Sequence, residues 1–217
     1  MGKLSDTRTK LRSLKWFYRN FKLIPDFVSW DERQWRSPAP SNVKRTFLSN
    51  RKCQLWIESG TYHGDTTHIL SSTADIVVTF EPDRALYEKA FLRFQDTNIH
   101  VIHGKSEDWL EDIIDSHLSQ QRNVINFYLD GHYSGNGTYF GTGESPIVKE
   151  LEVIEKFLPQ LNESQIYIDD FRSFEDHFPI LQSLDSTYPT KNYLVNFAKK
   201  NRLNWSVELD IFIMTKN

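Results

Sequence analysis

The sequence predicts an α/β protein built on a doubly wound, mostly parallel β-sheet, with an N-terminal helical extension. From about residue 52, short apolar runs rich in β-branched and aromatic residues alternate with helical stretches. Five strands separated by helices favour a parallel sheet that is covered on both faces. The chain has 217 residues, of which 39% are hydrophobic and 25% charged, and this is enough to bury a core of that kind.

The first 50 residues differ from the rest of the chain in charge and pattern. Residues 1–22 carry seven basic side chains against one acidic one, a local charge of +6, and their apolar residues recur at helical spacing. We expect a basic amphipathic helix over 7–22 that packs on its own domain; contact with an anionic membrane surface or a partner is the alternative. Residues 24–50 contain three prolines and little periodicity, and are expected to form a linker.

Residues 51–217 are expected to form the α/β domain. Its strands are predicted by apolar runs at 55–58, 76–81, 99–103, 124–130 and 165–169. Helices are predicted between and after them, near 65–73, 83–94, 106–118 and 146–158. A further helix is expected near 190–200, and the pattern of 205–215 fits either a tight hairpin or one bent strand.

Charge and cysteine content exclude several classes of function. The net charge of −3 gives no reason to expect nucleic-acid binding. The single Cys53 excludes an intramolecular disulfide and a thiolate metal site within one chain, and a reducing, cytoplasmic compartment is expected. The sequence contains no run of about 18 apolar residues, so no membrane span is predicted. The first residues lack the apolar centre of a secretory signal.

A ligand-binding loop is predicted directly after the first strand. There Glu58 is followed by glycines at positions 60 and 64, which let the backbone turn sharply and let a ligand approach closely. The second strand ends at Glu81, about twenty residues beyond the loop. At this position a doubly wound fold places the acid that accepts hydrogen bonds from ribose hydroxyls. The candidate cofactor-binding residues of these two segments are Glu58, Gly60, Thr61, Tyr62, Gly64, Thr66 and Glu81.

The residues of this loop favour a cationic nucleoside over a dinucleotide. A dinucleotide site prefers Gly-x-Gly-x-x-Gly around its pyrophosphate, whereas Tyr62 stands at the middle glycine position here. Glu58 is expected to add a negative charge, which repels phosphate and suits the sulfonium and ammonium groups of S-adenosylmethionine. An NAD-dependent oxidoreductase and a non-catalytic binding protein that keeps the fold are the alternatives.

The order of these motifs resembles that of class I S-adenosylmethionine-dependent methyltransferases, which have a Rossmann-like fold. The resemblance covers about residues 50–217 and rests on Glu58-x-Gly60-x-x-x-Gly64, Glu81, Gly104-x-Ser106 and Asp130. It implies that the first loop holds the methionine part of the cofactor and that Glu81 holds the ribose. It also implies that Ser106, or Glu107 beside it, flanks the adenine. Tyr62 departs from the family pattern.

Three acidic residues end the fourth and fifth predicted strands. Asp130 follows the fourth strand, and Asp169 and Asp170 follow the fifth. Because these strands are neighbours in the expected order, their ends lie about 5 Å apart. Carboxylates so close repel one another, so a bound cation is expected, and oxygen ligands suit Mg²⁺, Mn²⁺ or Ca²⁺. The alternative is that Asp169 or Asp170 caps the following helix while Asp130 faces solvent.

This acidic edge resembles in particular the metal-dependent macrocin-type sugar O-methyltransferases, in which a general base follows a metal-binding Asp by two residues. The resemblance implies that Asp130 acts as metal ligand, cofactor contact and catalytic residue, and that His132 is the base. An imidazole can take a proton from a polarised hydroxyl; a merely hydrogen-bonded or core histidine is the alternative. The glycine-rich segment 134–145 is expected to be a lid over the substrate or else a surface loop.

Together, the motifs and the resemblance predict an O-methyltransferase that acts on a hydroxyl of a sugar or another small polar metabolite. S-adenosylmethionine and a divalent ion, Mg²⁺ or else Mn²⁺ or Ca²⁺, are the expected cofactors. A small hydroxylated acceptor is the expected partner, with no role for nucleic acid. A homo-oligomer is compatible with the sequence but is not predicted by it.

Overall fold

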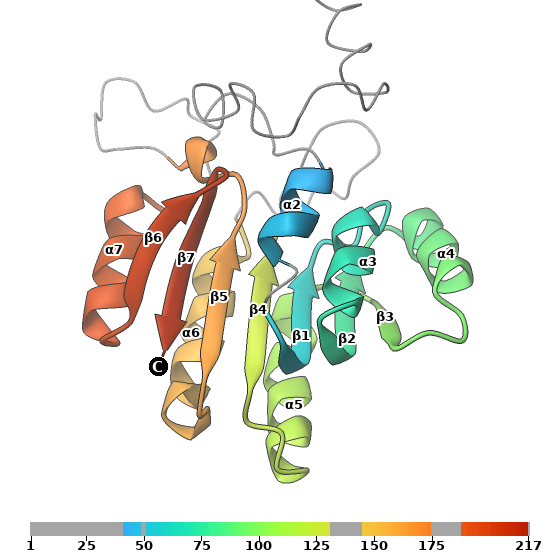
Figure 1. The fold of residues 1–217 in the computed structure, drawn as a ribbon, viewed down its shortest axis with the longest axis horizontal. Helices are drawn as coiled ribbons and strands as arrows, with labels where there is room; N and C mark the ends of the chain where they lie inside the picture. Colours follow the sequence, from blue (N-terminus) through green and yellow to red (C-terminus); the bar gives the residue numbers. More distant parts are fainter. Residues whose placement is uncertain (1–40, 49–50, 131–144, 175–187, 217) are drawn as a thin grey trace, which may run out of the picture.

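The computed structural model describes four parts of the chain, residues 41–48, 51–130, 145–174 and 188–216 (Figure 1). Four predicted features lie wholly or mostly outside the described residues: the helix over 7–22, the linker up to residue 40, the base His132, and the glycine-rich segment apart from Ser145. None of the described helices combines the length and apolarity that a membrane crossing requires.

The centre of the described structure is a seven-stranded sheet with the order β3-β2-β1-β4-β5-β7-β6 (Figure 1). Its strands are β1 (Cys53–Ser59), β2 (Ala74–Glu81), β3 (Ile99–His103), β4 (Ile125–Leu129), β5 (Ser164–Ile168), β6 (Asn204–Glu208) and β7 (Ile211–Lys216). Strands β1 to β5 run parallel to one another, whereas β7 runs antiparallel to β5 and β6 antiparallel to β7. The predicted doubly wound, Rossmann-like α/β fold is therefore confirmed.

The end of the chain forms a hairpin, which decides between the two structures that its pattern allowed. All of β6 pairs antiparallel with residues 211–215 of β7, and the turn between the two strands is Leu209-Asp210. Both turn residues have positive φ, 53° and 66°, as a tight two-residue hairpin turn requires. Neither is a glycine or asparagine, so the usual sequence signal for such a turn is missing.

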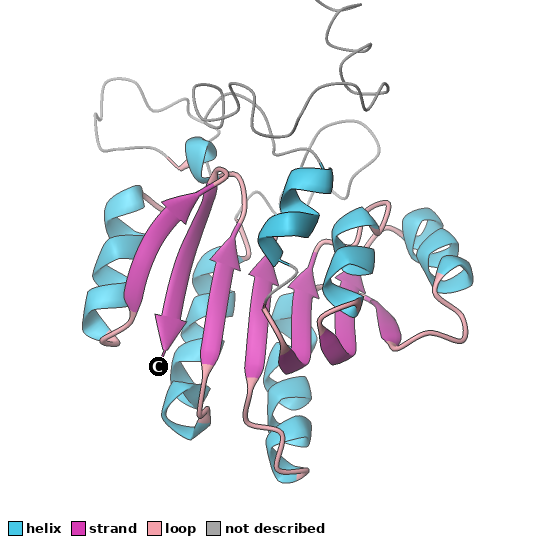
Figure 2. Ribbon diagram, in the orientation of Figure 1, coloured by secondary structure: helices cyan, strands magenta, loops and turns pink. Residues whose placement is uncertain are grey.

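Helices cover both faces of the sheet (Figure 2). They are α2 (Ser41–Leu48), α3 (Asp65–Ser71), α4 (Arg84–Arg93), α5 (Ser106–Ser119), α6 (Ile147–Phe157) and α7 (Lys191–Lys200), with the short 3₁₀ helices η1 (Leu158–Gln160) and η2 (Phe171–Ser173). Buried residues of α5, α6 and α7 pack on one face, and those of α2, α3 and α4 on the other. Strand residues alternate between these layers, with Ile57 in the first and Trp56 in the second.

Helix α2 lies within the segment 24–50, for which the sequence predicts a linker. Its last residue, Leu48, is fully buried in the layer that contains Trp56 and Tyr128. The helix has only eight residues, about two turns, which is too short for a hydrophobic period to stand out. The pair Pro40-Ser41 is a helix-start signal that could have indicated it.

Candidate functional site

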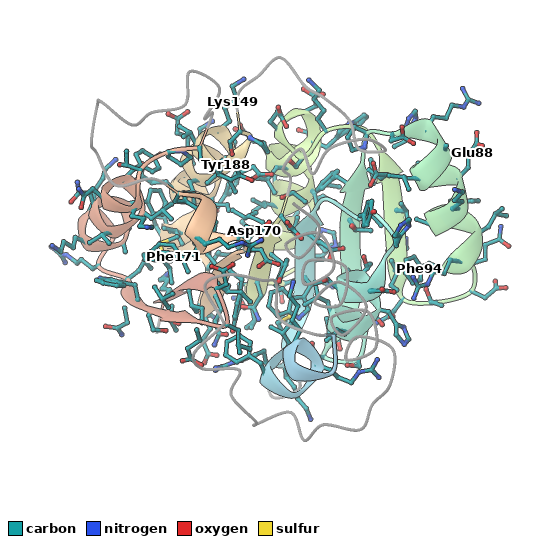
Figure 3. All side chains as sticks on the ribbon, turned by 90° about the horizontal axis from the view of Figure 1, so that it is seen from above. Glu88, Phe94, Lys149, Asp170, Phe171 and Tyr188 are labelled. Atoms are coloured by element: carbon teal, nitrogen blue, oxygen red, sulfur yellow. The ribbon has the colours of Figure 1, made fainter. Side chains whose placement is uncertain are left out.

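Among the described residues, the predicted site residues that follow β1, β2, β4 and β5 lie at the edge of the sheet where the parallel strands end. Figure 3 looks onto this edge, with Asp170 near the middle of the view. The hydrogen-bond ladder continues beyond the strands. The Asp130 N–H donates to the Ser59 carbonyl at 3.1 Å, and the Asp169 N–H donates to the Leu129 carbonyl at 3.1 Å. Asp130 and Asp169 therefore occupy neighbouring positions at this edge, as the expected strand order requires.

The loop after β1 turns back sharply over the end of β2. The N–H groups of Gly60 and Thr61 both donate to the Phe80 carbonyl, at 3.2 and 3.0 Å. Gly64 has a φ of 77°, and a Cβ atom on it would lie 2.6 Å from the ring of Phe94. A side chain at position 64 would thus be strained both by its backbone and by this contact. The second glycine of the motif is required by the fold of the loop itself.

Glu58 is a buried acid at the base of this loop, with 1% of its surface exposed. Its Oε2 atom accepts hydrogen bonds from the hydroxyls of Thr67, at 2.5 Å, and Thr79, at 2.7 Å. Burial raises the pKa of Glu58 to about 8 although these two hydroxyls oppose the shift. The expected negative charge at the loop is therefore largely neutralised by a proton near pH 7. Thr67 makes this bond rather than its neighbour Thr66, which the sequence singles out.

Glu81 joins the end of β2 to the loop after β1. Its Oε2 atom accepts a hydrogen bond from the Tyr62 N–H at 2.8 Å, and its Oε1 atom accepts one from the Asp83 N–H at 2.9 Å. Burial raises the pKa of the Glu81 carboxyl. Each carboxylate oxygen has a second lone pair, so Glu81 can accept further hydrogen bonds from a bound ligand. The structure thus brings together the glycine loop and the acid that the sequence predicts as partners.

The segment after β3 places Ser106 in the interior. The Ser106 hydroxyl donates a hydrogen bond to Oε1 of Glu150, a fully buried residue of α6. Burial raises the pKa of Glu150 to about 7. The Ser106 side chain therefore serves the contact between α5 and α6, and its predicted contact with a cofactor stays a prediction. Glu150 was not predicted as a site residue, because its sequence position is typical of a solvent-exposed charge on an amphipathic helix.

An aromatic pair beside Glu81 was also missed. The ring of Tyr87 on α4 stacks on that of His103 at the end of β3, with centroids 4.9 Å apart and planes inclined by 28°. His103 lies directly across from Glu81 in the ladder between β3 and β2. The pair therefore adds an aromatic surface to the edge of the sheet at which Glu81 lies. Its two residues come from consecutive elements, α4 and β3, but neither position carries a motif that predicts the contact.

Asp169 is bonded on both of its oxygens. Oδ2 accepts from the Lys44 ammonium, with Nζ at 2.5 Å, and from the Tyr128 hydroxyl at 2.7 Å, while Oδ1 accepts from the Asp170 N–H at 2.8 Å. Burial alone would lower the pKa of Lys44, but Asp169, and more weakly Asp130 and Asp170, raise it above its usual value. Lys44 is therefore a protonated cation at physiological pH.

Asp170 is paired with a second cation. Its φ of 56° places it in the left-handed region, and its Oδ1 lies 2.5 Å from the Arg172 guanidinium. Arg172 is itself held by Asp210 of the hairpin turn, through an ion pair and through its N–H, which donates to Asp210 Oδ1 at 2.8 Å. Although Asp170 precedes η2, its side chain makes no capping hydrogen bond. The capping alternative therefore does not describe Asp170.

The structure does not support the predicted divalent-cation site at Asp130, Asp169 and Asp170. Within the described residues, no group of three or more His, Cys, Asp or Glu side chains is arranged to hold a metal ion. The physical reason is that Lys44 and Arg172 already neutralise two of the three acids. The strand order does bring these acids to one edge, as the sequence predicts, but no sequence pattern links them to Lys44 and Arg172.

The fold of this chain is shared with solved methyltransferases. A protein from Staphylococcus aureus, provisionally assigned as a caffeoyl-CoA O-methyltransferase, is 14% identical, with 97% of this chain and 99% of that chain covered and a TM-score of 0.58. An S-adenosylhomocysteine-bound methyltransferase from Podospora anserina is 12% identical, with 100% and 96% covered and a TM-score of 0.54. A methyltransferase from Geobacter sulfurreducens is 11% identical, with 94% and 95% covered and a TM-score of 0.53.

Comparisons at the level of sequence add nothing to this likeness. A scan with protein-family models and a search of curated proteins each found no match to the chain. At such low identities, the structural neighbours establish the architecture, and the chemistry has to be argued from the residues of this chain.

Proposed function

We propose that this protein is an S-adenosylmethionine-dependent methyltransferase that acts on a hydroxyl of a sugar or another small polar metabolite. One observation carries the proposal: the buried Glu81 carboxylate is joined to the glycine loop through the Tyr62 N–H at 2.8 Å. This puts an acceptor for ribose hydroxyls directly beside a loop that a ligand can approach. Solved proteins that share the fold, including one bound to S-adenosylhomocysteine, support the same cofactor.

The charge and shape of the loop favour this cofactor over NAD. Tyr62 has a φ of 48° and a half-exposed side chain where a dinucleotide site would use a glycine for the pyrophosphate. Glu58 lies below the loop, and an ionised carboxylate there would repel phosphate and attract an ammonium or sulfonium. A cation that binds near Glu58 therefore favours release of its proton, whereas a pyrophosphate opposes it.

The chemistry assigns separate tasks to the two ends of the site. When bound, S-adenosylmethionine supplies a methyl group on a positively charged sulfur, and it leaves as S-adenosylhomocysteine. Glu81 would hold the ribose and Glu58 would face the methionine end, which fixes the donor in line with an acceptor oxygen. At the acidic edge, Asp130 would bind the acceptor, and His132 would take the proton from its hydroxyl. Because Asp169 and Asp170 already have cationic partners, no step is routed through a divalent ion.

The experiment is a calorimetric titration of the full chain with S-adenosylhomocysteine and, separately, with NAD⁺. We expect one S-adenosylhomocysteine to bind per chain and NAD⁺ not to bind. Glu81→Gln should weaken this binding by about tenfold or more, because it removes a charged hydrogen-bond acceptor. Glu88→Gln, an exposed change on α4, is the matched control and should leave the affinity unchanged. Binding of NAD⁺ alone would favour the oxidoreductase, and binding of neither would favour a non-catalytic protein.

A further inference from the structure

Lys44 is an unusual element of this edge, because it is a nearly buried cation that comes from a helix outside the repeating strand–helix pattern. Its side chain is 10% exposed and that of its partner Asp169 is 4% exposed. Helix α2 lies across the upper ends of β1 and β4 in Figure 1, and the buried Leu48 anchors its last turn in the core. The ammonium is thus held in place by the packing of the helix.

The surroundings of the ammonium match those of a bound cation. The Nζ atom lies 2.5 Å from Asp169 Oδ2 and 5.5 Å from the centroid of the Tyr128 ring, a distance at which a cation is attracted to the ring face. The Tyr128 hydroxyl donates to the same carboxylate oxygen at 2.7 Å. The carboxylate and the ring face both attract the positive charge, and the hydroxyl bonds the carboxylate oxygen that binds it.

A divalent ion and this ammonium compete for the same oxygen. Mg²⁺ needs a carboxylate oxygen at about 2.0–2.1 Å and near-ideal octahedral geometry. Asp169 Oδ2 already accepts two hydrogen bonds, and Oδ1 accepts the Asp170 N–H at 2.8 Å. An ion could therefore bind Asp169 Oδ2 only by displacing Lys44 or by turning the carboxylate away from its partners, both of which would leave a buried charge unpaired. The second lone pair of Oδ1 could accept an ion, but the charge of that ion would repel the Lys44 ammonium on the same carboxylate.

We propose that Lys44 is the built-in cation of this site: its ammonium takes the place of a divalent ion at the ends of β4 and β5, and it positions Asp169 there. Arg172 plays the same part for Asp170, through a guanidinium 2.5 Å away. Methyl transfer by this protein then requires no divalent ion. This last consequence rests on the proposed function, whereas the replacement of the ion by Lys44 does not.

The test compares the response of four proteins to divalent ions, using thermal unfolding in EDTA and in MgCl₂ or MnCl₂: the wild type, Arg45→Ala, Lys44→Ala and Lys44→Arg. The wild type and Arg45→Ala, an exposed change at the next position of α2, should unfold at the same temperature in all conditions. Lys44→Ala should unfold about 10 °C lower in EDTA, because it leaves a buried carboxylate unpaired. Mn²⁺ should recover part of this loss in Lys44→Ala alone, and Lys44→Arg should recover part of it without any metal.

Three results would overturn the proposal: a Lys44→Ala protein as stable as the Arg45→Ala control, a Lys44→Ala protein that is destabilised but indifferent to Mn²⁺, or a metal response of the wild type. Should Lys44→Ala fail to fold, calorimetric titration of the wild type with MnCl₂ and with MgCl₂ still decides. Binding of one ion that Asp169→Asn abolishes would refute the role of Lys44. The titration with S-adenosylhomocysteine is independent of these results, so failure of the proposed function would be seen separately.

Discussion

Replacing Glu150 by Gln tests how burial sets the acidity of a side chain beside the site. Glu150 is fully buried on α6 and accepts a hydrogen bond from Ser106. Burial raises its pKa from 4.5 to about 7. Between these two values the folded protein holds a proton that the unfolded chain has released, so its stability falls as the pH rises from about 4.5 to about 7.

The size of this effect follows from the shift in pKa. A difference of one unit between the pKa values of the unfolded and the folded state corresponds to about 1.4 kcal/mol. The raised pKa of Glu150 therefore lowers the free energy of unfolding by on the order of 3 kcal/mol at neutral pH. Glu150→Gln stays uncharged at every pH and keeps an oxygen that can accept from Ser106. Its stability relative to the wild type should therefore increase by that order between about pH 5 and about pH 8.

The assay is urea unfolding of the wild type, Glu150→Gln and the control Glu152→Gln at a series of pH values. Glu152 is exposed on the same helix, so its replacement should leave the pH dependence unchanged. Glu58, with a pKa of about 8, titrates in all three proteins, and the difference between them isolates Glu150. Parallel pH curves for the wild type and Glu150→Gln would refute the reasoning from burial.

Two further predictions concern the loop after β1. The affinity of the wild type for S-adenosylmethionine should rise with pH up to about 8, the pKa of Glu58, because a bound cation favours the ionised acid. Calorimetric titrations of Glu58→Gln should not show this rise. An unchanged rise in the variant would contradict the role of Glu58. Gly64→Ala should lower the free energy of unfolding by about 1–3 kcal/mol, since its Cβ would meet Phe94 at 2.6 Å. The control Ser71→Ala, a change at a partly exposed position of α3, should change it by less than about 0.5 kcal/mol. Equal losses in urea unfolding would show that the glycine is not required.

The sequence was sufficient to predict the sheet because the signals for its strands are local. Each parallel strand is an apolar run between helical segments, and the structure places all five close to the predicted positions. The exceptions are elements whose signals are short or unusual. Helix α2 spans eight residues, and the turn at Leu209-Asp210 adopts positive φ values without the glycine that normally signals such a turn.

The site could be predicted only where one residue follows a strand at a fixed distance. Glu58, Gly64 and Glu81 satisfy this condition, and the structure brings them to one edge. Ion pairs between distant parts of the chain do not meet this condition, because Lys44 and Asp169 are 125 positions apart in the sequence. The expectation of a divalent ion followed from the repulsion among the aspartates, and this repulsion does demand positive charge. The structure supplies that charge through Lys44 and Arg172.

The most direct test of the proposed cofactor site is a structure of the chain in complex with S-adenosylhomocysteine. The account predicts the ribose hydroxyls within hydrogen-bond distance of the Glu81 carboxylate, the methionine end beside Glu58, and the Lys44 ammonium still on Asp169. A nucleoside bound elsewhere on the molecule, or ribose hydroxyls that do not reach Glu81, would contradict it.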